Sequence, residues 1–218
     1  ILEAMSGYDP KDSTSLNVKE MDFHTSINEP IKDLKIGLPK EFFDAELPSY
    51  LQKSIQESVD VYKSLGANIV EISLPNINLS LPIYYIIAPA ECSANLSRYD
   101  GVRYGYRCKN PKDIDDLFMR TREEGFGSEV KRRILIGTYA LSAGYYDAYY
   151  LKAQKCRQLV ANDFAEAFKK VDVILSPTTP GTAFKSGEKT SDPVEMYLQD
   201  IFTIPVSYTH LRAHETRF

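Results

Sequence analysis

Histidine is scarce in this chain of 218 residues, which contains only His24, His210 and His214. His24 lies in the polar stretch MDFHTSINEP, which is typical of a surface loop, and the other two lie in a C-terminal tail discussed below. A Ser-His-Asp or Cys-His mechanism needs an imidazole held beside its nucleophile. The sequence therefore argues against both classes of histidine-dependent hydrolase.

Cysteine is equally sparse, with Cys92, Cys108 and Cys156 widely spaced along the chain. No CxxC pair and no Cys/His cluster is present, so we expect no zinc site and no other metal site. An odd and sparse cysteine count is typical of proteins in a reducing compartment. We expect three free thiols and a cytoplasmic location.

Several motifs that would define other functions are missing. The sequence has no P-loop, no GxSxG elbow and no HExxH pair. It has no apolar run of about 18 residues, so we expect no membrane span, and we recognise no signal peptide. The net charge of −4 argues against a general nucleic-acid-binding surface.

Arginine and tyrosine are concentrated between residues 84 and 157. This window holds ten of the fifteen tyrosines and 13 Lys and Arg against 9 Asp and Glu. No arginine precedes Arg98, and only Arg212 and Arg217 follow Arg157. The guanidinium fork matches a carboxylate, and tyrosine adds an apolar ring with a polar tip. The window predicts a site for a small carboxylated ligand; the alternative is a polar surface of arginine–carboxylate pairs.

Residues 34–74 have the pattern of a strand, a helix and a second strand. Residues 34–38 are a short apolar strand, and residues 68–74 form another that Pro75 ends. Between them, a helix beginning at Pro48 carries one apolar stripe, made of Leu51, Ile55, Val59, Tyr62 and Leu65. This unit predicts two parallel strands joined by a right-handed crossover.

The rest of the chain is mainly helical by pattern. The predicted elements are a helix at 82–99, a loop at 100–112, a helix at 113–122, a helical pattern at 128–170 and a strand at 171–175. A straight helix over 128–170 would be roughly 65 Å long, so Gly137 and Gly144 are predicted bends or close-packing points. The fold class is α/β.

Both ends of the chain depart from an ordinary protein sequence. ILEAMSG at the start resembles the last turns of a helix, so we expect a longer protein of which this chain is the C-terminal part. Residues 206–218 resemble a translated sequencing-library adaptor. We expect them to be a non-native tail and exclude them from fold reasoning; the alternative is an ordinary polar C-terminus.

Eight segments in one order carry a family resemblance. They are SGYDPKDSTS, KIGLPKEFF, YYIIAPAE, NLSRYDGVRYGYR, EGFGSEVKRRI, SAGYYDAYYLKAQK, DVILSPTTP and DPVEMYLQDIFTIP. Together they resemble the amidase-signature family and, within it, the A subunits of bacterial aspartyl/glutamyl-tRNA amidotransferases. The resemblance implies part of the amidase-signature fold, with a mixed central sheet flanked by helices. Residues 1–205 would be the C-terminal part of a single amidase domain, truncated here.

The resemblance implies a glutaminase subunit. Such subunits hydrolyse glutamine and supply ammonia to B and C subunits, which use ATP and magnesium to convert mischarged Glu-tRNA(Gln) or Asp-tRNA(Asn) into Gln-tRNA(Gln) or Asn-tRNA(Asn). The family uses a Ser–cis-Ser–Lys triad, in which lysine replaces histidine as the base. No GGSSGG-type signature is present here, so we expect the triad to lie upstream of Ile1. We expect no catalytic residue and no cofactor in this chain, and no activity from it alone.

The resemblance also implies which residues hold glutamine. Arg133 would fork onto the α-carboxylate, Asp200 would take the α-ammonium, and Tyr84 would line the pocket. Arg132 is the alternative to Arg133, and each of the three could instead make an ordinary structural hydrogen bond or surface pair. The threonines of the SPTTP segment are predicted to form a strand-end turn rather than a pocket wall.

Two other functions stay open on the sequence. One is a stand-alone amidase of the same family that acts on another amide. The other is a non-enzymatic α/β module that binds a small ligand, which predicts that residues 1–205 unfold cooperatively and bind glutamine by themselves. Under the glutaminase interpretation, the truncated sheet should instead expose apolar strand edges and faces.

Overall fold

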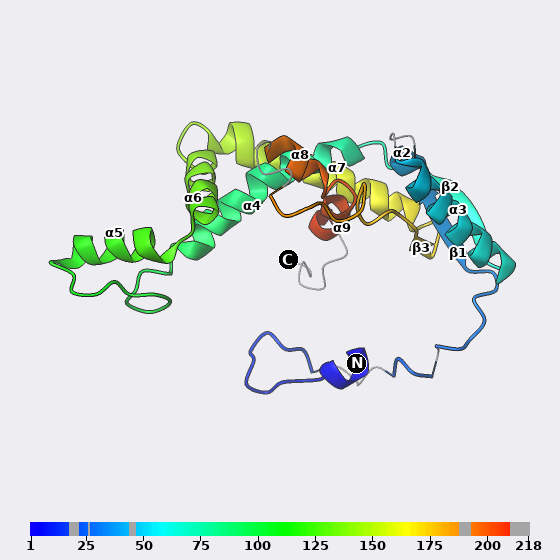
Figure 1. Cartoon of the computed structure of the whole chain (residues 1–218), viewed down its shortest axis with the longest axis horizontal. Helices are drawn as coiled ribbons and strands as arrows, with labels where there is room; N and C mark the ends of the chain where they lie inside the picture. Colours follow the sequence, from blue (N-terminus) through cyan, green and yellow to red (C-terminus); the bar gives the residue numbers. More distant parts are fainter. Residues whose placement is uncertain (18–21, 26, 44–46, 188–192, 210–218) are drawn as a thin grey trace.

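A small sheet lies at one end of an extended row of helices in the computed structural model (Figure 1). The structure describes residues 1–17, 22–25, 27–43, 47–187 and 193–209. In chain order the elements are α1 (Leu2–Met5), β1 (Lys35–Pro39), α2 (Lys40–Phe43), α3 (Ser49–Ser64), β2 (Asn68–Ile72), the 3-10 turn η1 (Ile77–Leu79), α4 (Ser80–Leu96), α5 (Ile114–Gly125), α6 (Ser128–Ala140), the π-helix η2 (Tyr146–Leu151), α7 (Lys152–Ala167), β3 (Val173–Ile174), α8 (Pro193–Leu198) and α9 (Thr203–Thr209).

The sheet has three parallel strands in the order β2-β1-β3. Ile36 of β1 pairs with Ile69 on one side and with Val173 on the other. Helix α3 joins β1 to β2, which confirms the predicted strand-helix-strand unit. Strand β3 is shorter than the predicted strand at 171–175, because the Val171 amide still donates to Ala167 in the last turn of α7.

The apolar stripe of α3 is confirmed over most of its length. Val59 is buried, and Leu51 and Ile55 pack against the core. Leu65 is 55% exposed, so its predicted place in the stripe is wrong. The helix ends at Ser64, and the chain turns at Gly66, whose φ of +90° favours glycine.

The long helical pattern at 128–170 is divided as its glycines predict. Residues 141–145 separate α6 from the π-helix η2, and Gly144 has a φ of +85° in this turn. Gly137 is a close-packing point, because a Cβ there would lie 1.9 Å from the carbonyl oxygen of Pro89 in α4. The two helices therefore approach each other too closely for any side chain at this position.

The hydrophobic core joins the sheet to helices α4 and α7. Leu74, Ile87, Val160 and Phe164 are all at most 1% exposed and belong to one cluster. Burial of each such side chain contributes about 1.5–3 kcal/mol. This packing holds α4 in place, and α4 carries most of the candidate site described below.

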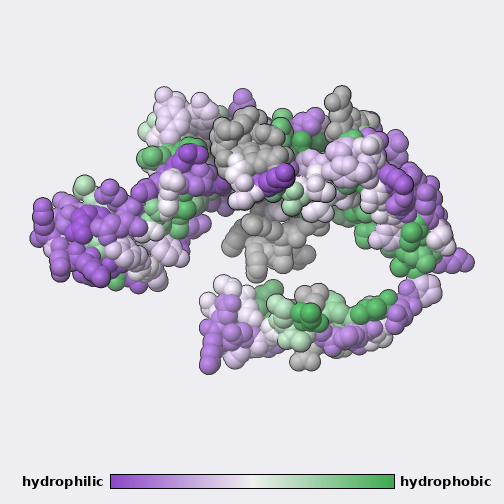
Figure 2. Space-filling view, in the orientation of Figure 1, coloured by the Kyte–Doolittle hydropathy of each residue, from purple (hydrophilic) through white to green (hydrophobic). Residues whose placement is uncertain are grey.

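The molecule exposes much more surface than a compact protein of its size. Its accessible area is 15618 Å², whereas about 10,000 Å² is expected for a compact monomer of this mass. The N-terminal segment lies apart from the helices, and α5 projects from the opposite end of the row from the sheet (Figure 1). Hydrophilic residues cover the α5 arm, whereas hydrophobic patches lie on the N-terminal segment (Figure 2).

The edge of the sheet is one of the exposed apolar surfaces. In the described part of the chain, β3 forms an outer edge, and Val173 is 42% exposed there. An unpaired apolar edge is an aggregation hazard. This agrees with the expectation that the sheet exposes apolar edges.

Asp163 ties helix α7 to the segment that follows β2. Its carboxylate accepts hydrogen bonds from the Asn76 backbone amide at 2.7 Å and from the Asn76 side chain at 3.0 Å. In a complete protein containing this chain, Asp163→Ala should lower the free energy of unfolding by about 1.5–3 kcal/mol, because a half-buried amide loses a charged acceptor. Urea denaturation measures this change.

Glu57→Ala is the control for this prediction. Glu57 pairs only with Lys53 among the ion pairs of the described residues, and both side chains are well exposed, so the loss should stay below about 0.5 kcal/mol. Equal effects of the two substitutions would contradict the role given to Asp163.

Candidate functional site

A cavity of about 480 Å³ lies between α4 and the C-terminal helix α9. Five α4 residues line it, namely Tyr84, Ala88, Glu91, Cys92 and Asn95, and they share one face of the helix. The opposite wall consists of Asp200, Thr203, Ile204, Ser207 and Tyr208. Its volume falls in the range of small-ligand sites, about 300–1,000 Å³.

Tyr84 connects the cavity to helix α6. Its half-buried ring packs edge-on against Tyr85 at 5.0 Å and against Tyr208 at 5.5 Å between ring centroids. Its hydroxyl oxygen accepts a hydrogen bond from Nη1 of Arg133 at 3.5 Å. Tyr84, the predicted pocket residue, therefore lines a cavity. It also lies beside Arg133, the residue predicted to bind the α-carboxylate of the ligand.

Arg133 is held as a charged group behind Tyr84. Its Nε donates to Oε1 of Glu129 at 3.1 Å. Burial opposes the charged form, but hydrogen bonds with Tyr84 and Glu129 outweigh it and raise the pKa of Arg133. Its guanidinium is thus oriented by two protein groups. A guanidinium held in a fixed orientation is ready to donate hydrogen bonds to a carboxylate.

Arg132 occupies a different position on α6. Its Nη1 donates to Oε2 of Glu129 at 2.9 Å, and its side chain is 59% exposed. Only Arg133 of the two has a hydrogen bond to Tyr84. The geometry favours Arg133 over Arg132, and the assignment of a ligand to either stays a prediction.

Asp200 lies on the opposite wall of the cavity and is exposed. The pKa of Tyr85 shows which charges surround this region. Burial raises that pKa most, Tyr197 and Tyr84 raise it further, Arg133 opposes the rise and Asp200 adds to it. Tyr84 and Asp200 line one cavity and Arg133 bonds to Tyr84, so the structure brings together three residues that are far apart in the sequence.

Four further residues that the sequence patterns did not indicate also line the cavity, namely Glu91, Cys92, Asn95 and Thr203. The α4 residues among them could have been found from Tyr84, since positions seven, eight and eleven residues later fall on the same helical face. The threonines of the SPTTP segment are not among the described lining residues. Thr179 donates to the Gly181 carbonyl at 2.7 Å, as expected of a turn.

The two ends of the chain bear on the site in different ways. The position of the catalytic triad upstream of Ile1 stays a prediction. Ser207 and Tyr208 line the cavity from α9, and Tyr208 is buried, although both belong to the segment predicted to be non-native. Residues 210–218 lie outside the described residues, so the foreign origin of residues 206–218 also stays a prediction.

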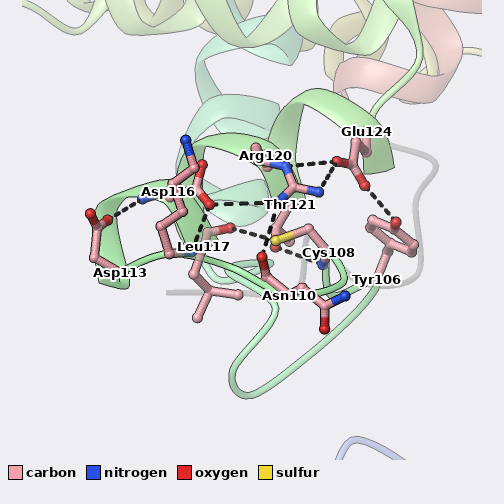
Figure 3. A network of polar contacts seen from close by, with 10 residues as sticks. Tyr106, Cys108, Asn110, Asp113, Asp116, Leu117, Arg120, Thr121 and Glu124 are labelled. Carbon is pink, nitrogen blue, oxygen red and sulfur yellow. Dashed lines mark hydrogen bonds and ion pairs between the residues drawn. The ribbon is translucent and has the colours of Figure 1, made fainter.

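Most arginines of the 84–157 window do not belong to this site. On the α5 arm, Tyr106 donates to Glu124 at 2.6 Å, and Arg120 pairs with Glu124 and Asp116 (Figure 3). Arg122 donates to the carbonyl oxygens of Leu96 and Tyr99. Tyr106 through Glu124, and Arg120 through the Asn110 carbonyl, join the 100–112 loop to α5, and Arg122 joins α5 to the end of α4. The window thus contains arginine–carboxylate pairs as well as Arg133, which contacts the cavity residue Tyr84, and Arg157, whose guanidinium carbon lies 6.0 Å from the ring centroid of Tyr208.

Other kinds of site find no support in the described part of the chain. No group of three or more His, Cys, Asp or Glu residues there could hold a metal ion. None of the helices described has the length and apolar character that crossing a membrane requires. All three cysteines carry free thiols, as expected.

Comparison with known proteins relates this chain to one family. The family model described as Amidase matches residues 1–218. The chain is 61% identical to the A subunit of glutamyl-tRNA(Gln) amidotransferase from Thioalkalivibrio sulfidiphilus over 97% of its length, and 60% identical to that from Hahella chejuensis over 98%. It spans only 44% of each relative.

A solved structure supports the same placement. The crystal structure of the A subunit of glutamyl-tRNA(Gln) amidotransferase from Thermotoga maritima matches with a TM-score of 0.65 and 37% identity. The match covers 93% of this chain and 39% of that one. The α/β fold, with a parallel sheet flanked by helices, is thus part of the fold of that protein. On the family model, the relatives and the shared fold, this chain belongs to the amidase family.

Proposed function

We propose that this chain is the C-terminal portion of the glutaminase subunit of a tRNA-dependent amidotransferase. The observation that carries the proposal is the grouping of Tyr84, Arg133 and Asp200 around one cavity. The relatives support the same function, since they are amidotransferase A subunits with 61% and 60% identity to this chain.

Arg133, which contacts Tyr84 beside the cavity, and Asp200, which lines the cavity, would provide opposite charges for the two ends of a free amino acid. Arg133 would donate to the α-carboxylate of glutamine, and Tyr84 would hold the guanidinium in place. Asp200 would accept from the α-ammonium across the cavity. A ligand with only one of these charges would make only one of the two charged contacts and would bind more weakly.

The proposal assigns binding but not bond cleavage to this chain. No Gly/Ser-rich signature occurs in its sequence, and no lysine is among the residues described as lining the cavity. We infer that the Ser–cis-Ser–Lys triad lies upstream of Ile1, in the part of the relatives that this chain does not span. ATP and magnesium would act in a partner B subunit, and a C subunit together with mischarged tRNA would complete a cytoplasmic complex.

The complete gene product tests this function. Genomic DNA on both sides of the coding segment should reveal a Ser/Gly-rich signature upstream and different codons after Pro205. The complete subunit, expressed with its B and C partners, should release glutamate from glutamine, and the 218-residue chain alone should release none.

Three outcomes would contradict parts of the proposal. Absence of glutaminase activity with every partner present would refute the function. Hydrolysis of unrelated amides without any partner would favour a stand-alone amidase. Activity from the 218-residue chain alone would show that a nucleophile is present in it.

A further inference from the structure

Glu91 places a second carboxylate in the candidate site. It lines the cavity together with Asp200, and no lysine or arginine is among the described lining residues. Among the residues that the structure describes, the Glu91 side chain has no hydrogen-bond or ion-pair partner. The proposed binding of glutamine's two charged groups uses Arg133 and Asp200, so it leaves Glu91 without a role.

Glu91 lies further along α4 than Tyr84, the residue that contacts Arg133. It follows Tyr84 by seven residues on the same face of α4, which is about 10 Å along the helix axis. Arg133 contacts Tyr84 at the other end of this stretch. A glutamine bound by its head between Arg133 and Asp200 would point its side chain toward Glu91 if it extended along this face of α4.

The Glu91 carboxylate is suited to bind the carboxamide of glutamine and to repel the side-chain carboxylate of glutamate. An ionised carboxylate only accepts hydrogen bonds. The carboxamide of glutamine carries two N–H donors, whereas the carboxylate of glutamate, the product of hydrolysis, carries none and has the same charge as Glu91. Like charges brought together in a binding site strongly oppose association.

We propose that Glu91 is a specificity-determining residue that accepts a hydrogen bond from the glutamine carboxamide and repels the side-chain carboxylate of glutamate. This inference rests on the proposed function. Repulsion of the wrong ligand is a common source of specificity. Here it would favour entry of the amide and release of the acid from the same site.

Glu91→Gln in the complete, partnered enzyme separates the hydrogen bond to glutamine from the charge repulsion of glutamate. The new amide oxygen still accepts from the substrate, so the KM for glutamine should change by less than about threefold. The negative charge is gone, so the inhibition constant of glutamate should fall by about tenfold or more. Competitive inhibition assays and calorimetry of glutamate binding measure this tightening, which a merely structural role would not produce.

Two further variants make the test decisive. Glu91→Ala also removes the charge and should tighten glutamate binding, but it loses the acceptor and should raise the KM for glutamine by about tenfold. Glu71→Gln removes an exposed carboxylate on β2, outside the described cavity lining, and should change neither constant.

The possible failures are distinguishable. An unchanged glutamate inhibition constant in both Glu91 variants, with glutaminase activity retained, would overturn the role of Glu91 and leave the proposed function standing. A wild-type enzyme that does not hydrolyse glutamine would overturn the proposed function and this inference together.

Discussion

Replacement of Arg133 by alanine is expected to lower kcat/KM for glutamine by about 10- to 150-fold in the complete, partnered enzyme. This range corresponds to about 1.5–3 kcal/mol, the usual contribution of a hydrogen bond to a charged group. Arg133 is held by Glu129 at 3.1 Å and by the Tyr84 hydroxyl at 3.5 Å, so its guanidinium is already oriented before a carboxylate arrives. Glutamate release measured over a range of glutamine concentrations gives the ratio.

Arg132→Ala is the matched control, because Arg132 is the neighbouring residue on α6 and pairs with the same Glu129. It is well exposed, and the Tyr84 hydroxyl bonds to Arg133 instead, so loss of Arg132 should change kcat/KM by less than about threefold. An equal loss from both variants, or no loss from Arg133→Ala, would contradict the assignment of the carboxylate to Arg133.

Asp200, the residue proposed to bind the α-ammonium, can be tested with the same assay. Asp200→Ala should lower kcat/KM for glutamine by a similar factor, about 1.5–3 kcal/mol in free energy, because the α-ammonium loses its acceptor. A glutamine analogue without the α-ammonium should be used equally poorly by the wild-type enzyme and the variant. A further loss with that analogue would indicate that Asp200 acts through the structure instead.

Gly137→Ala is expected to destabilise the complete protein by about 3 kcal/mol or more. A Cβ at this position would lie 1.9 Å from the Pro89 carbonyl oxygen and 2.4 Å from its carbon. Both atoms are backbone and cannot rotate away, so α4 and α6 would have to separate. Because Tyr84 lies on α4 and Arg133 on α6, the same separation should raise the KM for glutamine. Urea denaturation and substrate titration measure the two effects.

Gly127 provides the control for this steric argument. It precedes the same helix α6, has an ordinary φ of −65°, and an added Cβ would meet nothing within 4 Å. Gly127→Ala should therefore change stability by less than about 1 kcal/mol. If Gly137→Ala is as mild as this control, the two helices do not pack as closely as the structure shows.

The local elements follow closely from sequence patterns. The apolar stripe at Leu51, Ile55 and Val59 predicts α3, and the two flanking apolar runs predict parallel strands that the structure contains. The errors lie at element ends, where Leu65 is exposed and the Val171 amide bonds to the end of α7 rather than to β1. Helix and strand periodicity depends on neighbours in the chain, whereas an end depends on competing hydrogen bonds and caps.

The sequence offered candidate residues for the site but not their arrangement, and their roles stay predictions. The resemblance implied Tyr84, Arg133 and Asp200, and all three lie at or beside one cavity. Glu91 escaped notice, because a lone glutamate in a helical pattern has no distinguishing signal until α9 is placed opposite it. The arginines of the window are likewise indistinguishable by sequence pattern, whereas in the structure Arg120 bonds to the Asn110 carbonyl and Arg122 to the Leu96 carbonyl, away from the cavity.

The order of residues alone is sufficient to establish the α/β class, the family resemblance and the chemistry available to the site, because these depend on local periodicity and on short motifs. The choice of Arg133 over Arg132, and the cavity between α4 and α9, come from the way distant helices pack. Gly137 lets α6 approach Pro89 closely, and this approach puts Arg133 rather than Arg132 beside Tyr84. A contact of that kind depends on the crossing of two helices, which no local pattern in either helix specifies.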